Sequence, residues 1–234
     1  NQLKAAAILE REFVRQPEHP GLAHYIIHSF DVPPLAPRAL DAARRYAKIA
    51  PDAPHALHMP SHTFTRVGSW QESIDANLAS AAAARRDNAT AEELHGLDYQ
   101  TYAYLQTAQD AAAKRTLGAI GALGGKIETG GAGNAAPPPA GYYALAAIPA
   151  RYAMERQQWV DAMTLTVRPA RNTPYTEAIT HFARAIGAAP PSNPAEAAPD
   201  VGRRAAIRDG ELELKDAYWA EQVDIQRRAA EAWV

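Results

Sequence analysis

The spacing of hydrophobic and polar positions along the chain predicts helices and no strands. No stretch keeps the polar and apolar alternation that is typical of a half-buried β-strand. Apolar residues instead recur three and four positions apart, which places them on one face of a helix. Helices are expected over residues 3–14, 94–107, 110–123, 142–155, 159–165, 175–189, 195–209 and 214–233, with two further helices beginning at Pro20 and Pro54.

An internal repeat of 34 residues organises the first half of the chain. The second copy repeats the proline, the two histidines and the phenylalanine of the first: Pro20 with Pro54, His24 with His58, His28 with His62, and Phe30 with Phe64. This period is typical of a helix–turn–helix unit. Gly68 allows the tight turn inside the second unit, and Trp70 begins its second helix. After a short insertion over 85–93, the phase continues from Leu94.

On these residues the chain resembles the tetratricopeptide-repeat family. The segments 19–28, 53–62 and 93–99 are most similar to a subgroup of bacterial repeat proteins that has no assigned activity. The resemblance implies an all-α solenoid of about five helix pairs, wound as a right-handed superhelix. The first helix of each pair would line a concave groove.

The same resemblance sets the expected domain organisation. Residues 1–123 would form repeats with a His-rich concave face. The Gly- and Pro-rich residues 124–141 would form a loop or linker, and residues 142–234 would form further, more divergent helical repeats. Members of the subgroup are longer and this sequence begins without Met, so we expect a segment of a longer protein.

Composition excludes several function classes. The chain has 234 residues and no cysteine, which rules out disulfides, thiolate catalysis and cysteine-type zinc sites. The formal net charge of −2 argues against a general nucleic-acid binder, which needs a basic excess. No apolar run approaches the length of a membrane span, and no signal-peptide pattern is present. The localisation is therefore left open.

Histidines form the most informative pattern. Seven of the eight lie between positions 19 and 95. In repeat phase, position 5 of the first helix holds His24, His58 and Asp98, position 9 holds His28, His62 and Tyr102, and position 2 holds His55 and His95. The resemblance implies that these positions face the groove. Because adjacent helices pack about 8–10 Å apart, imidazoles from two helices can meet at one ion.

The sequence therefore predicts a metal site in the groove. The core ligands would be His24, His28, His58 and His62, followed by His55, His95 and Asp98. Nitrogen and oxygen ligands of this kind suit zinc, copper, nickel or iron. Tyr25, Tyr99, Tyr102 and Arg151 would contact a ligand or partner in the same groove.

Two other functions remain open. The groove could bind a protein or peptide without any metal, or an open coordination position could make the chain a metal-dependent enzyme of unknown reaction. A zinc-metalloprotease motif is not present, because Tyr25 and Met59 follow the first histidine of each pair where that motif has glutamate. The sequence assigns no catalytic residue. Pro60 falls inside a predicted helix and is expected to interrupt it.

Overall fold

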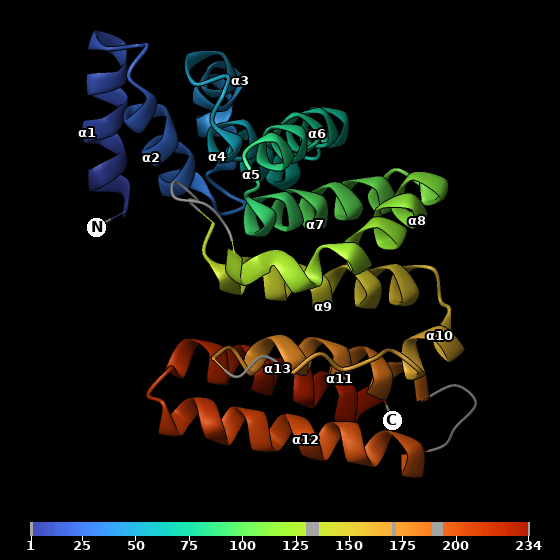
Figure 1. Ribbon diagram of the computed structural model, residues 1–234. Coiled ribbons are helices and arrows are strands. Elements are labelled where there is room, and N and C mark those ends of the chain that lie inside the picture. Colours follow the sequence, from blue (N-terminus) through green and yellow to red (C-terminus); the bar gives the residue numbers. More distant parts are fainter. Residues whose placement is uncertain (1, 130–135, 170–171, 189–193, 234) are drawn as a thin grey trace. The chain divides into compact units, whose positions relative to one another are not determined.

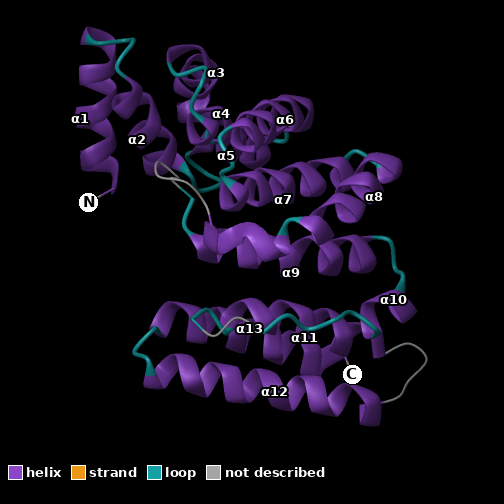
Figure 2. Ribbon diagram, in the orientation of Figure 1, coloured by secondary structure: helices purple, strands orange, loops and turns teal. Residues whose placement is uncertain are grey.

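The computed structural model describes residues 2–129, 136–169, 172–188 and 194–233, and the regular structure of these residues is entirely helical (Figure 2). The all-α prediction is confirmed at this level. The chain divides into two compact units, Asn1–Gly141 and Tyr142–Val234. Each unit is described by itself below.

The first unit is built from helices that pack mainly against their neighbours in the sequence (Figure 1). In chain order they are α1 (Gln2–Arg15), α2 (Pro20–Phe30), η1 (Ala36–Ala39), α3 (Leu40–Ile49), α4 (Pro54–His58), α5 (Pro60–Val67), α6 (Trp70–Arg86), α7 (Thr90–Gln106), α8 (Asp110–Ala119), η2 (Ile120–Ala122) and η3 (Gly124–Thr129). The η elements are short 3-10 helices. In addition, α2 contacts α5 and α4 contacts α7, so the first helices of successive repeats lie next to one another.

The repeat positions expected to be apolar are the ones that the fold buries. Ala23 and Leu57 lie in the interior, as do Phe30 and Phe64 one period apart. Phe30 and Phe64 belong to one hydrophobic core with residues of α1 and α3. Burial of this stripe turns the opposite face of α2, α4 and α5, which carries the histidines, away from that core.

Proline divides the second repeat helix in two, as expected. Pro60 has no N–H to donate, and the helix is interrupted at Met59, between α4 and α5. Met59 nevertheless keeps helical backbone angles, with φ −52° and ψ −36°. The chain direction is therefore largely retained, and His58 and His62 remain about one turn apart on either side of the break.

The insertion over 85–93 lengthens helices instead of adding a loop. α6 continues to Arg86, and α7 begins at Thr90, four residues before the predicted start. Further along, α8 ends at Ala119 and is continued by 3-10 turns, short of the predicted end at 123. Of the predicted loop over 124–141, η3 covers the first six residues, 130–135 lie outside the described residues, and α9 already begins at Pro138.

Residues with a left-handed backbone conformation lie at the turns inside the repeats. Gly68 closes α5 with φ +76°, as the sequence predicts for this turn. Ala108 stands at the matching place between α7 and α8 with φ +55°. Only glycine adopts this conformation without a steric cost, so Ala108 holds a strained backbone.

We therefore expect Ala108→Gly to raise the free energy of unfolding by about 1 kcal/mol, because it relieves that strain. Equilibrium urea unfolding measures the change. The matched control is Ala79→Gly on the exposed face of α6, which should lower stability by about 1 kcal/mol because glycine weakens a helix interior. A loss of stability in both variants would contradict the assignment.

The second unit contains α10 (Trp159–Met163), α11 (Tyr175–Ala188), α12 (Pro194–Glu213), α13 (Ala217–Trp233) and most of α9 (Pro138–Glu155). Small residues bring its helices close together. Ala147 and Ala150 of α9 pack on Ile179 and Ala183 of α11. A Cβ at Gly187 of α11 would lie 2.6 Å from the carbonyl oxygen of Trp159, so only glycine fits there. Among the described helices, none combines the length and the apolar character needed to cross a membrane.

Candidate metal centre

Six histidines of the first unit form two groups of three. In each group the candidate ligand nitrogens lie within 4.8 Å of one another. We call them the outer triad and the inner triad. The outer triad consists of His24, His28 and His55, and the inner triad consists of His58, His62 and His95.

Each triad has the same construction. It takes the His-x-x-x-His pair of one repeat and adds the histidine at position 2 of the next repeat. His55 of α4 thus joins the pair on α2, and His95 of α7 joins the pair that spans α4 and α5. The sequence predicted that the two pairs would meet at one ion, whereas the structure assigns them to different triads. Successive helices are staggered, so position 2 of one lies level with positions 5 and 9 of the preceding one.

The ring of His58 at the centre of the inner triad has a fixed orientation. It is fully buried, and its Nδ1 lies 2.7 Å from Oδ1 of Asn77. The amide of Asn77 is itself oriented, because its Nδ2 donates to the carbonyl oxygen of Ser73 at 2.8 Å. Asn77 Oδ1 is therefore the acceptor, and Nδ1 of His58 carries the proton. A neutral imidazole has one N–H, so Nε2 of His58 offers a lone pair.

His62 is oriented in the same way by a carboxylate. Its Nδ1 donates to Oδ2 of Asp31 at 2.9 Å, while Oδ1 of Asp31 accepts from Nε of Arg66 at 2.9 Å. Burial opposes ionisation of Asp31, but the hydrogen bonds from His62 and Arg66 outweigh it and lower its pKa. Asp31 is therefore an anion at neutral pH. A carboxylate that holds the Nδ1–H of a metal-binding histidine is a common outer partner of metal sites.

When each ring carries only its Nδ1 proton, two lone pairs face each other inside the inner triad. Nε2 of His58 and Nε2 of His62 are 3.1 Å apart. Two nitrogens that are each 2.0–2.1 Å from a tetrahedral ion lie about 3.3 Å apart. The His95 ring completes the group, with its centroid 4.3 Å from that of His58. Tyr99 packs edge-on against His58 and places its hydroxyl 3.4 Å from Nδ1 of His62.

The outer triad is more open to solvent. His24 and His55 are half-buried, and His28 is exposed. The ring centroids of His28 and His55 lie 4.6 Å and 5.4 Å from that of His24. Nδ1 of His24 is 3.2 Å from the hydroxyl of Tyr46.

A buried carboxylate stands behind His55 in the outer triad. Nδ1 of His55 lies 3.5 Å from Oε2 of Glu92, which is long for a hydrogen bond. The other oxygen of Glu92 accepts from the backbone N–H of Ala136 at 2.5 Å. Burial opposes ionisation of Glu92, yet His55 and the Ala136 amide together lower its pKa. Each triad therefore has one anionic carboxylate at the far side of one of its rings.

Burial, together with the proximity of other histidines, suppresses the charging of four of these imidazoles. Burial and neighbouring histidines lower the pKa of His24 and of His95 to about 4. Burial also lowers the pKa of His58 well below its usual range, and the pKa of His28 falls in the same direction. These rings are neutral at physiological pH, which is the form that binds metal.

These shifts predict acid instability of the chelated, metal-free protein. The unfolded chain protonates its histidines near pH 6.5, while the folded chain resists protonation down to about pH 4. The unfolded state binds more protons in this window, so the free energy of unfolding falls as the pH falls. Each neutral histidine contributes up to about 1.4 kcal/mol per pH unit.

Urea unfolding in EDTA at a series of pH values measures this slope. His24→Gln should make the slope shallower between pH 6.5 and 4, because it removes one of the groups that only the unfolded chain protonates. A stability that stays constant over this range would contradict the shifts.

The remaining predicted site residues are distributed over the chain. Tyr25 lies edge-on to His24, and Tyr99 contacts the inner triad. Asp98 is buried on α7 but belongs to neither triad, and Tyr102 packs against Trp70. Asp98 and Tyr102 occupy positions 5 and 9 of the third repeat, so the series of histidine pairs ends there. Arg151 lies on α9 in the second unit, and its role in a groove stays a prediction.

Sequence reasoning did not identify the residues that orient the rings. Asp31 directly follows α2, Asn77 lies on α6, and Glu92 lies in the insertion. Only Asn77 left a signal in the sequence. It shares one helix face with Ser73 and Ser80, at spacings of four and three, and all three are fully buried. A buried polar stripe of this kind indicates that polar partners lie on the adjacent helix.

Comparisons with models of known protein families, with curated proteins and with solved structures found no match to this chain.

Proposed function

We propose that the chain is a tetratricopeptide-type helical-repeat protein that binds two transition-metal ions, one in each histidine triad. The repeat assignment is supported by the 34-residue period, the paired helices and the left-handed turns at Gly68 and Ala108. The metal assignment is supported by the convergence of three imidazole nitrogens at each of two repeat-related places.

One observation supports the metal proposal more strongly than the others. Nε2 of His58 and Nε2 of His62 lie 3.1 Å apart. The Nδ1 atom of each ring donates its proton to a fixed acceptor, so it does not supply one to this contact. Two acceptor atoms at this distance repel each other unless a cation lies between them. A metal ion satisfies both lone pairs, together with that of His95.

The donor set limits the choice of metal. Three neutral imidazoles with carboxylates outside the first ligand shell suit zinc, copper, nickel or iron and disfavour magnesium or calcium, which prefer oxygen ligands. A three-histidine site leaves a tetrahedral ion one further position. We propose metal binding as the function; an enzyme would in addition use that fourth position to activate water.

Elemental analysis of the purified, tag-free chain tests the proposal. We expect two zinc-class ions per chain in the wild type. His58→Gln with His62→Gln should leave one ion, and His24→Gln with His28→Gln should also leave one. The control is His181→Gln, because His181 lies in the second unit and is hydrogen-bonded to Asp200 at 2.6 Å. It should leave two ions.

Absence of metal after reconstitution would overturn the proposal. The 3.1 Å contact between Nε2 of His58 and Nε2 of His62 would then be a hydrogen bond between the two rings. The histidine face would in that case act in protein or peptide binding, the second function that the sequence allows.

A further inference from the structure

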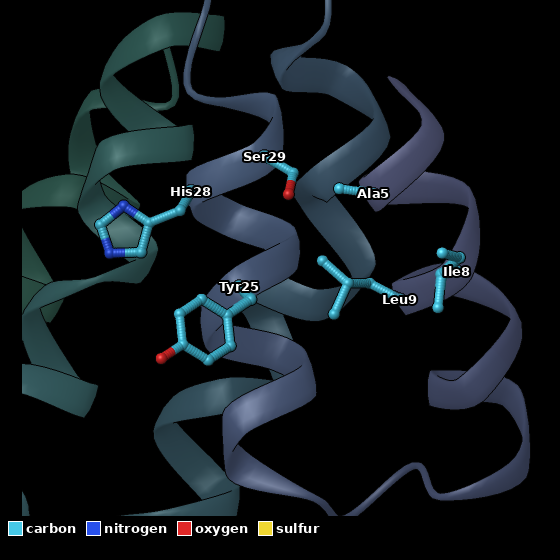
Figure 3. A pocket seen from close by; sticks show the side chains of 6 residues that line it. All are labelled: Ala5, Ile8, Leu9, Tyr25, His28 and Ser29. Atoms are coloured by element: carbon cyan, nitrogen blue, oxygen red, sulfur yellow. The ribbon is translucent and has the colours of Figure 1, made fainter. Parts of the chain in front are cut away.

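A pocket opens beside the outer triad. It has a volume of about 430 Å³, and it is lined by Ala5, Ile8, Leu9, Tyr25, His28 and Ser29. The first three come from α1 and the other three from α2 (Figure 3). The pocket is shallow and wide open to solvent.

The pocket has an apolar end and a polar end. The side chains of Ile8 and Leu9 form the apolar end on α1, and Ile8 is 53% exposed. In Figure 3 the ring of His28 and the ring of Tyr25 point to the same side of α2, away from α1. His28 is a lining residue of the pocket and also a member of the outer triad.

The two triads differ in how they can be reached. His58 at the centre of the inner triad is fully buried, and His62 and His95 are partly buried, so an ion there is less accessible than one in the outer triad. The outer triad keeps His28 exposed at the pocket rim. If each ion has three histidine ligands, the fourth position of the outer ion is the more accessible one for a ligand from solvent.

Charge selects the kind of ligand. Neutral imidazoles leave the full positive charge on a divalent ion, so the site attracts an anion. The carboxylates next to the cluster lie outside the triads: Asp31 contacts His62 and Arg66, and Glu92 contacts the Ala136 amide with one oxygen while its other oxygen lies 3.5 Å from Nδ1 of His55. Neither carboxylate is among the candidate ligands of the outer triad, so its open position is available to an anionic group from solvent, and an alkyl chain on that group would lie against the hydrocarbon wall of Ile8 and Leu9.

We infer that the ion of the outer triad, together with this pocket, binds a small aliphatic carboxylate. The carboxylate takes the fourth position of the ion beside His28, and the alkyl chain lies on the α1 wall. The inner ion has a structural role and holds α4, α5 and α7 together. This inference rests on the proposed function, because it needs a metal in the outer triad.

Cobalt(II) is the probe, since its visible absorption reports on its coordination. The His58→Gln/His62→Gln variant is loaded with cobalt, so that only the outer triad contributes to the spectrum. It is then titrated with hexanoate and with acetate. Both should perturb the spectrum, and hexanoate should bind at least about tenfold more tightly, because four additional methylenes leave water.

Two matched variants on one helix locate the alkyl chain. Ile8→Ser, introduced in the same background, removes apolar wall and should reduce the preference for hexanoate about threefold or more. Val14→Ser removes an apolar residue of α1 that is exposed outside the pocket, and it should leave the preference unchanged. In the His24→Gln/His28→Gln variant, neither carboxylate should alter the cobalt spectrum.

The outcomes separate the two proposals. Failure of cobalt and zinc to bind any variant or the wild type overturns the proposed function itself. Binding of cobalt with a spectrum that ignores both carboxylates leaves the metal function intact and overturns this inference. Equal affinity for hexanoate and acetate, or a preference that Ile8→Ser does not reduce, also overturns it. A response that persists without His24 and His28 places the ligand elsewhere and does the same.

Discussion

Zinc at a hundredfold excess over its dissociation constant is expected to raise the free energy of unfolding by about 2.7 kcal/mol for each triad it fills. The physical reason is linkage: the ion binds a set of nitrogens that only the folded chain brings together. The six ligands come from α2, α4, α5 and α7, so unfolding of the first unit destroys both triads. Urea unfolding followed by circular dichroism, with zinc and with EDTA, measures the difference.

Variants show where the stabilisation arises. Loss of either triad should halve the gain from zinc, and loss of both should abolish it. If the two units unfold in separate transitions, only the transition of the first unit should move, because the second unit has no triad among its described residues. A gain that survives removal of both triads would show that zinc binds elsewhere and would contradict the assignment.

The helical architecture could be predicted from local information. The period of 34 residues, the apolar positions and the turn glycine all lie close together in the sequence, and each acts through backbone geometry. The start of α11 at Tyr175 agrees with the sequence prediction. The start of α13 at Ala217 lies three residues after the predicted start at residue 214. The start of α7 was missed by four residues, because nothing local distinguishes an insertion that extends a helix from one that forms a loop.

The candidate site was predictable in its residue types and less so in its grouping. Repeat phase placed His24, His28, His58 and His62 on one side of their helices, and all four are members of the triads. Which histidines share a triad depends on the stagger between neighbouring helices, which is a tertiary quantity. The phase of the sequence carries no information about it, so His55 and His95 were ranked below the pairs that they complete.

The residues that orient the histidine rings could not be predicted from the sequence, for a different reason. Asp31 is 31 residues from His62, and Glu92 is 37 residues from His55. The two carboxylates also do not occupy the same position within their repeats. Their part in the site follows only from three-dimensional proximity. They are also what distinguishes the triads from a surface on which histidines merely gather, because fixed acceptors decide which ring nitrogen is free to bind.

This dependence on fixed acceptors leads to a sharp prediction at Asn77. Replacement of Asn77 by leucine removes the acceptor for Nδ1–H of His58 within a fully buried environment. The metal-free protein should lose about 1–3 kcal/mol of stability, because a buried donor is left without a partner. The ring can also shift its proton to Nε2, which blocks the lone pair that the ion needs.

We therefore expect Asn77→Leu to weaken metal binding by the inner triad about 10- to 100-fold. The measurement is a competition titration of zinc in the His24→Gln/His28→Gln background, where only the inner triad remains. Ser61→Ala is the matched control: Ser61 is equally buried and donates to the same Asn77 Oδ1 at 3.4 Å, and its replacement leaves the contact between Asn77 Oδ1 and His58 Nδ1 in place. It should leave the zinc affinity within about twofold, since the tautomer of His58 is unaffected. Equal zinc affinity in the leucine variant and the wild type would show that Asn77 does not set the free nitrogen, and the argument from the facing Nε2 atoms would fail with it.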